Sequence, residues 1–156
     1  MRVQDSIGGL ESILVSVAQK ATCKRSKCGS IIFDPFNKIV IGEGYNSMPC
    51  HETGECFKDN LSSSFKSDKT CCIHAEQRAI MNALKNYPKN IKGSILFFIR
   101  LDENNQPKRS GKPYCSICSK MALDVGLTEF ALWHQEGWTF YGTKEYNDIT
   151  FQYTEE

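Results

Sequence analysis

The segment that most constrains the fold is the run from Ile95 to Ile99, where five apolar residues follow one another without a polar residue. A strand with one solvated face alternates apolar and polar residues, so an unbroken apolar run is typical of a strand covered on both faces. Helical patterns flank this run in the chain, from His74 to Asn86 and from Cys115 to Val125, the second ended by Gly126. We therefore expect a sheet with helices on both of its faces.

Other segments predict further elements of the same sheet and its helical layers. Apolar residues at helical spacing predict a helix from Asp5 to Lys20, and turn residues between two short β-like runs predict a hairpin. The expected strands are Gly29 to Phe33, Lys38 to Glu43, Ser94 to Arg100, Glu129 to His134 and, as a possible last one, Ile149 to Tyr153. A single α/β domain covering residues 1–156 is predicted.

Composition and charge exclude several classes of protein. The hydrophobic fraction of 40% and the charged fraction of 24% are ordinary for a soluble globular protein. A formal net charge of +1 gives no electrostatic case for a protein that coats nucleic acid, so no nucleic-acid partner is expected. No apolar run approaches the roughly 18 residues of a membrane span. Met1 to Glu11 contains acids and lacks an apolar core, which excludes a secretory signal, and we expect a cytoplasmic protein.

His74, Glu76 and the pair Cys115 and Cys118 form the pattern with the clearest chemistry. Imidazole and thiolate groups bind zinc, and three protein ligands leave the fourth tetrahedral position open for water, as in catalytic sites. Glu76 follows His74 by two residues, so the two side chains cannot share one face of a helix. We predict a catalytic zinc ion held by His74, Cys115 and Cys118, with Glu76 as the acid and base that acts on the water.

The same residues allow two other interpretations. Cys115 and Cys118 alone would also suit a dithiol redox pair, which would bind no metal. A zinc-stabilised binding module without activity is the second alternative. The presence of Glu76 speaks against that module, because a structural zinc site has no need of a carboxylate there.

The order of these motifs resembles a known signature. His74-Ala75-Glu76, followed by Pro113-Tyr114-Cys115-Ser116-Ile117-Cys118, is similar to the H-x-E and P-C-x-x-C pattern of zinc-dependent nucleobase deaminases. From about Ala21 to Trp133 the chain resembles the cytidine/deoxycytidylate deaminase superfamily, and Gly44-Tyr45-Asn46 is most similar to dCMP deaminases. The resemblance implies a three-layer α/β/α cytidine-deaminase-like fold with a mixed central sheet of about five strands. It also implies hydrolysis of a cytosine-containing nucleotide or nucleoside, dCMP as the best candidate, to its uracil counterpart and ammonia.

Several substrate-binding residues are implied by this resemblance. Asn46 would meet the sugar hydroxyl, although an asparagine after a strand can also bond its own backbone in a turn. The Ala75 backbone N–H and the region of Cys115 would hold the base. Arg25, with Lys24 and Lys27 in the same loop, could bind a phosphate or could form an ordinary solvated surface.

Tyr114 marks a departure from the family pattern. The family usually has proline directly before the first cysteine, whereas here Tyr114 separates Pro113 from Cys115. The preceding loop, Asp102 to Lys112, is also longer than the usual connection. Both differences lie where the family lines its base pocket, so Tyr114 is a candidate substrate-binding residue. Another free base, a modified pyrimidine, a purine or RNA is the alternative substrate.

The other cysteines suggest a second metal. Eight cysteines in a cytoplasmic chain indicate metal ligands or free thiols more readily than disulfides. Some dCMP deaminases carry a structural zinc ion, and the resemblance implies Cys23, Cys50, Cys56 and either Cys71 or Cys72 as its ligands here. Reduced buried thiols are the alternative, and His51 could replace one cysteine. Family members are commonly dimers or hexamers, so a homo-oligomer is expected.

Overall fold

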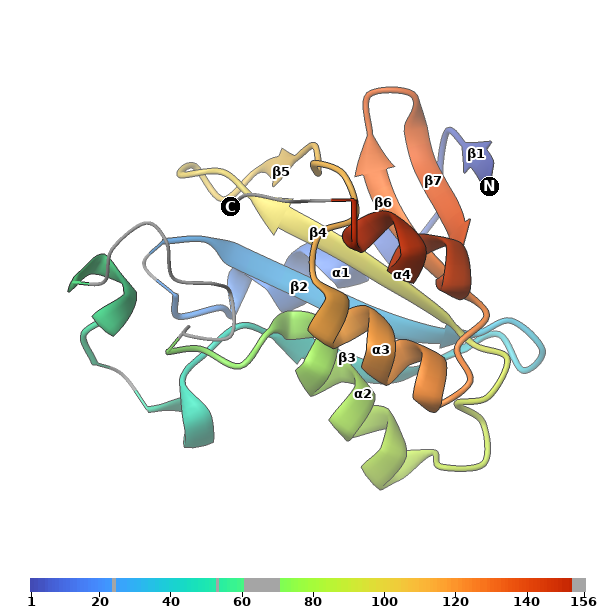
Figure 1. Cartoon of the computed structure of the whole chain (residues 1–156), viewed down its shortest axis with the longest axis horizontal. Coiled ribbons are helices and arrows are strands. Elements are labelled where there is room, and N and C mark those ends of the chain that lie inside the picture. The colour runs from blue at the N-terminus through green and yellow to red at the C-terminus, as the bar shows by residue number, and fades with distance from the viewer. Residues whose placement is uncertain (24, 53, 61–70, 153–156) are drawn as a thin grey trace.

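A mixed β-sheet with helices on both faces organises the computed structural model, which describes residues 1–23, 25–52, 54–60 and 71–152 (Figure 1). The strands are β1 (Arg2–Gln4), β2 (Lys27–Asp34), β3 (Ile39–Tyr45), β4 (Ile95–Leu101), β5 (Pro107–Lys108), β6 (Glu129–His134) and β7 (Gly137–Gly142). The helices are α1 (Leu10–Gln19), α2 (Ala75–Asn86), α3 (Ser116–Asp124) and α4 (Thr143–Thr150), with short 3-10 turns at Pro49–His51 and Phe57–Asn60.

The strand order is β1-β7-β6-β4-β2-β3, and β5 pairs with the end of β4. β4 and β6 run parallel and are joined by the crossover through α3, whereas the other pairs in the described part of the chain are antiparallel. The predicted mixed sheet is confirmed, but it contains 7 strands within the described residues instead of about five.

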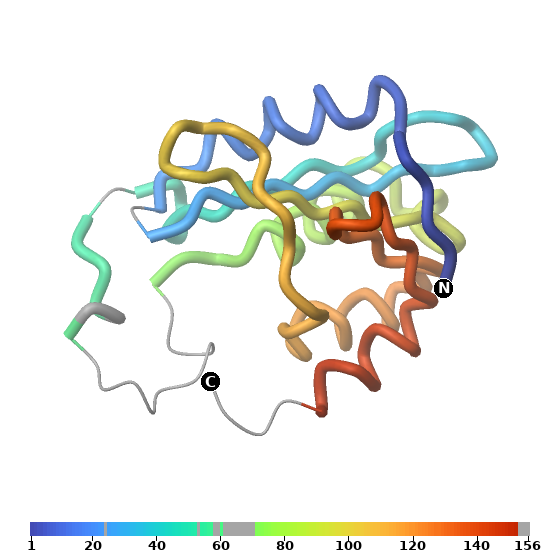
Figure 2. Tube along the Cα trace, turned by 90° about the horizontal axis from the view of Figure 1, so that it is seen from above, coloured from blue at the N-terminus to red at the C-terminus, as the bar shows by residue number. Residues whose placement is uncertain are grey.

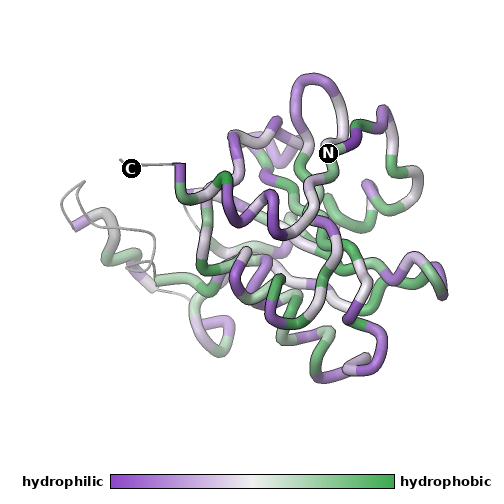
Figure 3. Tube along the Cα trace, turned by 45° about the vertical axis from the view of Figure 1, so that its right-hand side comes forward, coloured by the Kyte–Doolittle hydropathy of each residue, from purple (hydrophilic) through white to green (hydrophobic). Residues whose placement is uncertain are grey.

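The three layers follow from the two apolar faces of the sheet. Leu14, Val17 and Ala18 of α1 pack on one face against Phe97 and Ile99 of β4. Side chains of α2, α3 and α4 cover the opposite face, and Figure 2 shows α1 on one side of the sheet with α3 and α4 on the other. The two faces of β4 are thus buried in different cores, which explains its unbroken apolar run. In Figure 3 the apolar residues accordingly follow the central strands.

Helix α2 lies unusually close to β3, the edge strand, because two glycines face it. A Cβ atom added to Gly44 would lie 2.3 Å from the Ala75 carbonyl oxygen and 2.4 Å from the Ala79 nitrogen. A Cβ added to Gly42 would lie 2.5 Å from the Ala79 carbonyl oxygen. Only a residue without a side chain permits this approach. The contact places the first turn of α2, which carries His74 and Glu76, directly over the end of β3.

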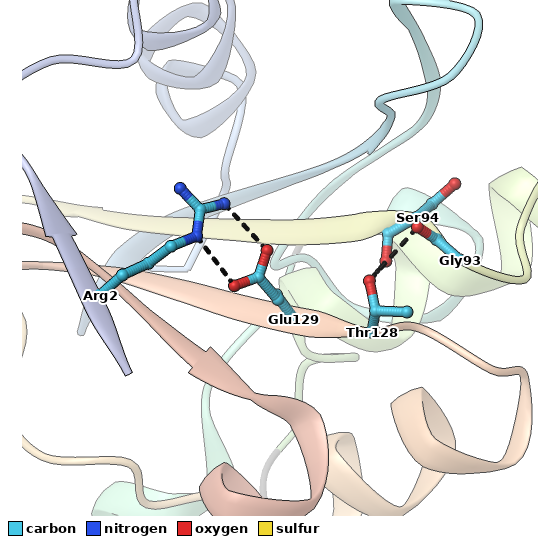
Figure 4. Close-up of polar contacts among 5 residues, drawn as sticks. All are labelled: Arg2, Gly93, Ser94, Thr128 and Glu129. Atoms are coloured by element: carbon cyan, nitrogen blue, oxygen red, sulfur yellow. Dashed lines mark hydrogen bonds and ion pairs between the residues drawn. The ribbon is translucent and has the colours of Figure 1, made fainter.

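Side-chain hydrogen bonds also connect the N-terminal strand β1, and the turn before β4, to the start of β6 (Figure 4). The Arg2 guanidinium donates to the Glu129 carboxylate at 3.1 and 2.9 Å and lies over the Phe140 ring at 4.0 Å from its centre. Thr128 Oγ1 donates to the carbonyl oxygens of Gly93 and Ser94 at 3.2 and 3.3 Å. These bonds join β1 and the turn before β4 to the β6–β7 unit.

The C-terminal strand predicted from Ile149 to Tyr153 is wrong. Ile149 and Thr150 belong to α4, residues 151–152 form a turn, and Tyr153 lies outside the described residues. Thr143, Tyr146 and Thr150 are buried at helical spacing, so packing against the sheet overrides the β-preference of the β-branched residues. The last strand in the described part of the chain is instead β7, a buried strand that was not predicted.

The other predicted elements are confirmed within a few residues. Helix α1 begins at Leu10 and not at Asp5, because Gly8 adopts a left-handed φ of 63° that interrupts a helix. The expected hairpin, the two helices around the apolar run and the strand from Glu129 to His134 all form. None of the helices among the described residues is long and apolar enough to cross a membrane.

The packing of α2 on β3 gives the first prediction. Gly44→Ala should lower the free energy of unfolding by about 1–3 kcal/mol, because the new methyl group must displace the α2 backbone. Gly9→Ala is the matched control, since a Cβ there meets nothing within 4 Å and the backbone is already helical. Chemical denaturation of both variants measures the difference. Equal stabilities would show that the glycine does not control this contact.

Candidate metal centre and catalytic cavity

A cavity of about 270 Å³ lies where the first turns of α2 and α3 meet. His74 occupies the N-cap position of α2, and Cys115 occupies that of α3. The His74 backbone N–H donates to the Gln77 side chain at 3.0 Å, which fixes the start of α2. Two helices that are distant in sequence thus direct their N-termini at one point, where their dipoles favour negative charge.

His74, Cys115 and Cys118 bring three metal-binding atoms together at this point. Their donor atoms all lie within 4.8 Å of one another, the only such group of three or more among the described residues. His74 Nδ1 lies 3.3 Å from the sulfur of Cys115 and 3.3 Å from that of Cys118. Cys118 is fully buried, and Cys115 is exposed by only 9%.

The donor set fits a zinc ion. Tetrahedral zinc with the usual bond lengths separates a nitrogen ligand from a sulfur ligand by roughly 3.5 Å, close to the separations found here. A set of one imidazole and two thiolates binds zinc in preference to magnesium or calcium, because those two ions take oxygen ligands. His74, Cys115 and Cys118 could therefore hold zinc and leave its fourth position facing the cavity.

The electrostatics of the cluster favour ionised sulfur. Hydrogen bonding from Cys118, together with the nearby His74 ring, lowers the pKa of Cys115 to about 4 despite its burial. The pKa of Cys118 is raised, first by its hydrogen bond to Cys115 and then by burial. Of the two thiols, Cys115 is therefore the one that ionises more readily, with Cys118 as its hydrogen-bond partner.

Glu76 lies beside these ligands in the wall of the cavity. Only 7% of its surface is exposed, and burial raises the pKa of its carboxyl group, with a further rise from the negative charge of Cys115. His74 and the Cys118 thiol act in the opposite direction. A buried carboxyl with a raised pKa is suited to both accept and release a proton near neutral pH.

Asn46 lines the cavity, and its side chain is held by backbone groups at and just before the start of β2. Its Oδ1 accepts from the Cys28 N–H at 2.8 Å, and its Nδ2 donates to the Ser26 carbonyl at 2.7 Å. This network fixes the orientation of the amide, because the N–H can only donate and the carbonyl can only accept. Among the described residues, no further hydrogen bond uses the second N–H and the second lone pair of this amide.

The other predicted substrate-binding residues also reach the cavity. Ala75, Arg25 and Tyr114 all line it, and Tyr114 is 40% exposed. Lys24 lies outside the described residues. Lys27 does not line the cavity, and its ammonium group donates to Asn105 Oδ1 at 3.1 Å.

Several cavity residues were not found from the sequence. Arg100, Ser110 and Lys112 come from the end of β4 and the long loop that follows it, and Tyr146 comes from α4. Burial raises the pKa of the Tyr146 hydroxyl well above its usual range. The length of the loop from Asp102 to Lys112 was the available signal for the first group. Tyr146 gave no local signal, because its segment was not recognised as a helix.

Four further cysteines lie near one another in the wall of the cavity. Cys23, Cys56, Cys71 and Cys72 all line it, and the Phe57 N–H donates to the Cys71 sulfur at 2.9 Å. Burial raises the pKa of Cys72 to about 11, and the other three cysteines add to this shift. Cys50 is exposed and does not line the cavity. The structure therefore brings together Cys23, Cys56 and both alternatives for the fourth ligand, Cys71 and Cys72, but not Cys50.

Comparison with known proteins identifies the class. Residues 9–133 match the family described as the cytidine and deoxycytidylate deaminase zinc-binding region. The match covers more than half of the chain, which therefore belongs to this family. The motif His74-Ala75-Glu76 and the pair Cys115 and Cys118 both fall inside the matched region. The comparison with curated proteins gives no match.

Solved structures show the same fold. The dCMP deaminase from the cyanophage S-TIM5 in apo form has a TM-score of 0.55 at 21% identity, covering 97% of each chain. The S-TIM5 structure in complex with dCMP and dUMP has a TM-score of 0.52 at 23% identity, covering 80% of this chain and 81% of that chain. The cytidine deaminase from Burkholderia pseudomallei has a TM-score of 0.59 at 15% identity, covering 90% and 95%. The chain thus has the cytidine-deaminase-like fold.

Proposed function

We propose that this protein is a zinc-dependent hydrolytic deaminase that converts a cytosine nucleotide, with dCMP as the best candidate, to its uracil counterpart and ammonia. The observation that carries the proposal is the buried Glu76 carboxyl beside His74, Cys115 and Cys118 in one cavity. A structural metal site has no use for that carboxyl. Membership in the deaminase family supports the same chemistry.

Each residue of the cluster has a defined task in this proposal. His74, Cys115 and Cys118 would hold the zinc ion, which supplies a Lewis acid that makes water acidic enough to react near neutral pH. The Glu76 carboxylate accepts a proton from the attacking water and delivers it to the ring nitrogen beside the reacting carbon. It then takes up the second proton of the water and passes it to the leaving amino group, which departs as ammonia. Glu76 is regenerated, so one carboxyl group serves the whole cycle.

The charges around the cavity favour a nucleotide over a nucleoside. Arg25, Arg100 and Lys112 are exposed cations at its wall, whereas Glu76 is the only carboxylate among the described residues that line it. Guanidinium and ammonium groups bind phosphate through charge-assisted hydrogen bonds. The S-TIM5 enzyme of the same fold is a dCMP deaminase, which agrees with this choice.

The mechanism predicts the effect of removing the carboxyl group. Glu76→Gln should lower kcat for dCMP by about 10²- to 10⁴-fold, because the amide cannot shuttle the proton. Zinc content should stay unchanged, since Glu76 is not among the three proposed ligands. Ammonia release and zinc analysis of the same sample measure both quantities.

Glu43→Gln serves as the matched control, because Glu43 is an exposed carboxylate of β3 outside the cavity. It should retain wild-type turnover. Full activity of Glu76→Gln with zinc bound would exclude the proposed mechanism.

The phosphate proposal makes a separate prediction. Lys112→Ala should raise KM for dCMP by about 10- to 100-fold, the loss expected for one charged hydrogen bond. KM for deoxycytidine, which has no phosphate, should not change. Lys120→Ala is the control, since Lys120 is an exposed residue of α3 that does not line the cavity. Equal use of dCMP and deoxycytidine by the wild-type protein would contradict phosphate recognition.

Other substrates remain alternatives within the same chemistry: a free base, a modified pyrimidine, a purine or RNA. Ammonia release from cytosine, cytidine, deoxycytidine, their phosphates, and adenine and guanine compounds separates these cases. The net charge of +1 argues against RNA, which binds proteins largely through its phosphates. Activity on RNA would also depend strongly on salt, so an activity that does not change with salt would exclude RNA.

We also propose a second zinc ion, bound by Cys23, Cys56, Cys71 and Cys72. Their shared place in the lining of the cavity and the interaction of Cys72 with the other three support this set. Because their donor atoms are not gathered as tightly as those of the His74 cluster, metal binding would have to draw the sulfurs together.

Zinc stoichiometry tests the second ion. The wild-type protein should hold about two zinc ions per chain, and Cys72→Ser should reduce this to about one, because a structural site needs all four ligands. Cys50→Ser is the matched control and should leave the zinc content unchanged, since Cys50 lies outside the cluster. A wild-type ratio of one, or equal losses in both variants, would refute the second site.

A homo-oligomer, a dimer or a hexamer, and a cytoplasmic location stay predictions. The resemblance to the deaminase family supports the first, and light scattering would measure it.

A further inference from the structure

The loop before Cys115 forms one wall of the cavity and is held by residues outside that wall. Ser110, Gly111, Lys112 and Tyr114 line the cavity. This segment lies between β5 and α3 and contains no helix or strand of its own. Its position therefore depends on individual hydrogen bonds to the neighbouring strands.

Those bonds come from the end of β6. The Ser110 N–H donates to the Trp133 carbonyl at 2.8 Å, and the Ser110 carbonyl lies 3.1 Å from His134 Nδ1. Arg109 Nη1 donates to the His134 carbonyl at 2.7 Å, and its guanidinium lies over the Trp133 ring at 3.5 Å from the centre. The Ser110 hydroxyl has no hydrogen-bond partner among the described residues. The loop is thus held through the peptide groups of Ser110 and through Arg109.

The partners of His134 determine its hydrogen-bonding state. A carbonyl oxygen only accepts, so Nδ1 carries the hydrogen that is donated to Ser110. In the neutral ring Nε2 is then an acceptor, and the Tyr141 hydroxyl donates to it at 2.8 Å. Tyr141 is a buried residue of β7, and its ring meets that of His134 edge to face, 5.9 Å between centres. β7 therefore orients the imidazole so that Nδ1–H faces the loop.

We propose that His134 is a positioning residue that sets substrate affinity by holding the wall from Ser110 to Lys112 through its Nδ1–H. The inference rests on the proposed deaminase function. His134 does not itself line the cavity, so it takes no part in proton transfer. It acts by fixing the backbone that carries Lys112, the residue placed to meet the substrate phosphate.

Two amide substitutions separate the two hydrogen bonds of the ring. The nitrogen of asparagine matches the position of Nδ1 and can keep the bond to Ser110, whereas the nitrogen of glutamine matches Nε2 and cannot. His134→Gln should raise KM for dCMP by about three- to tenfold with kcat changed by less than about twofold. His134→Asn should stay near the wild-type KM. Equal KM values in the two variants, or a loss confined to kcat, would overturn the proposal.

Two measurements that need no turnover keep this inference separate from the proposed function. Amide hydrogen exchange at Ser110 should accelerate in His134→Gln and not in His134→Asn. Calorimetry should show that dUMP, the expected product, binds more weakly to His134→Gln than to His134→Asn. If exchange accelerates in His134→Gln while dUMP affinity and KM stay constant, the contact is structural only and the proposal fails. If the wild-type protein neither binds dUMP nor releases ammonia from cytosine compounds, the proposed function fails, while exchange still reports whether His134 holds the loop.

Discussion

The close approach of α2 to β3 is the constraint on which the site depends. Gly42 and Gly44 present no side chain to the helix, and Ala75 and Ala79 present only small ones or backbone atoms. The helix can therefore lie directly on the edge strand, and residues at its N-terminus line the same cavity as Asn46. A bulkier residue on either element would move His74 and Glu76 together, since both belong to the first turn.

The second half of the site depends on the crossover from β4 to β6. These strands are parallel neighbours, so the chain has to cross over one face of the sheet between them, and α3 forms this crossover. Side chains of α3 pack in the same core as those of α2, so both helices cover the same face. Its first turn brings Cys115 and Cys118 to His74, and the resulting pocket holds two sulfurs and a carboxyl group with little exposure to water. Buried negative groups at such short separations repel one another. Burial, with a further contribution from the negative charge of Cys115, raises the pKa of Glu76, and a bound divalent cation would offset the repulsion between these groups.

The parts of the fold that were predicted correctly are those with a local pattern. The apolar run of β4, the turn residues after Asp34 and the helical spacing after His74 each identify their element without knowledge of the rest. The helix α4 was missed because its few buried positions are separated by charged and polar residues, and because Ile149 to Tyr153 has the composition of a strand. The strand β7 was missed because the connection before it is short and because its first residue, Gly137, is of a type that is depleted in strands. Contacts with the sheet, not local preference, determine both elements.

In the site, too, the residues that belong to a local motif were predicted, whereas those that come from distant segments were not. The ligands of the proposed zinc ion and Glu76 follow from short motifs, and the structure brings them together. The position of Cys50 outside the cysteine cluster could not be predicted, because it depends on how the chain turns after Tyr45. Arg100, Lys112 and Tyr146 come from three separate elements, and only their folding places them at one cavity. No spacing rule relates such residues along a chain.

The central claim is that water, activated at the His74 cluster and deprotonated by Glu76, replaces the amino group of a cytosine nucleotide. Turnover of dCMP in ¹⁸O-labelled water tests it most directly, with the product examined by mass spectrometry. The account predicts dUMP that carries one labelled oxygen at the reacting carbon, together with one equivalent of ammonia. Unlabelled dUMP, or no dUMP from zinc-loaded protein, would contradict it.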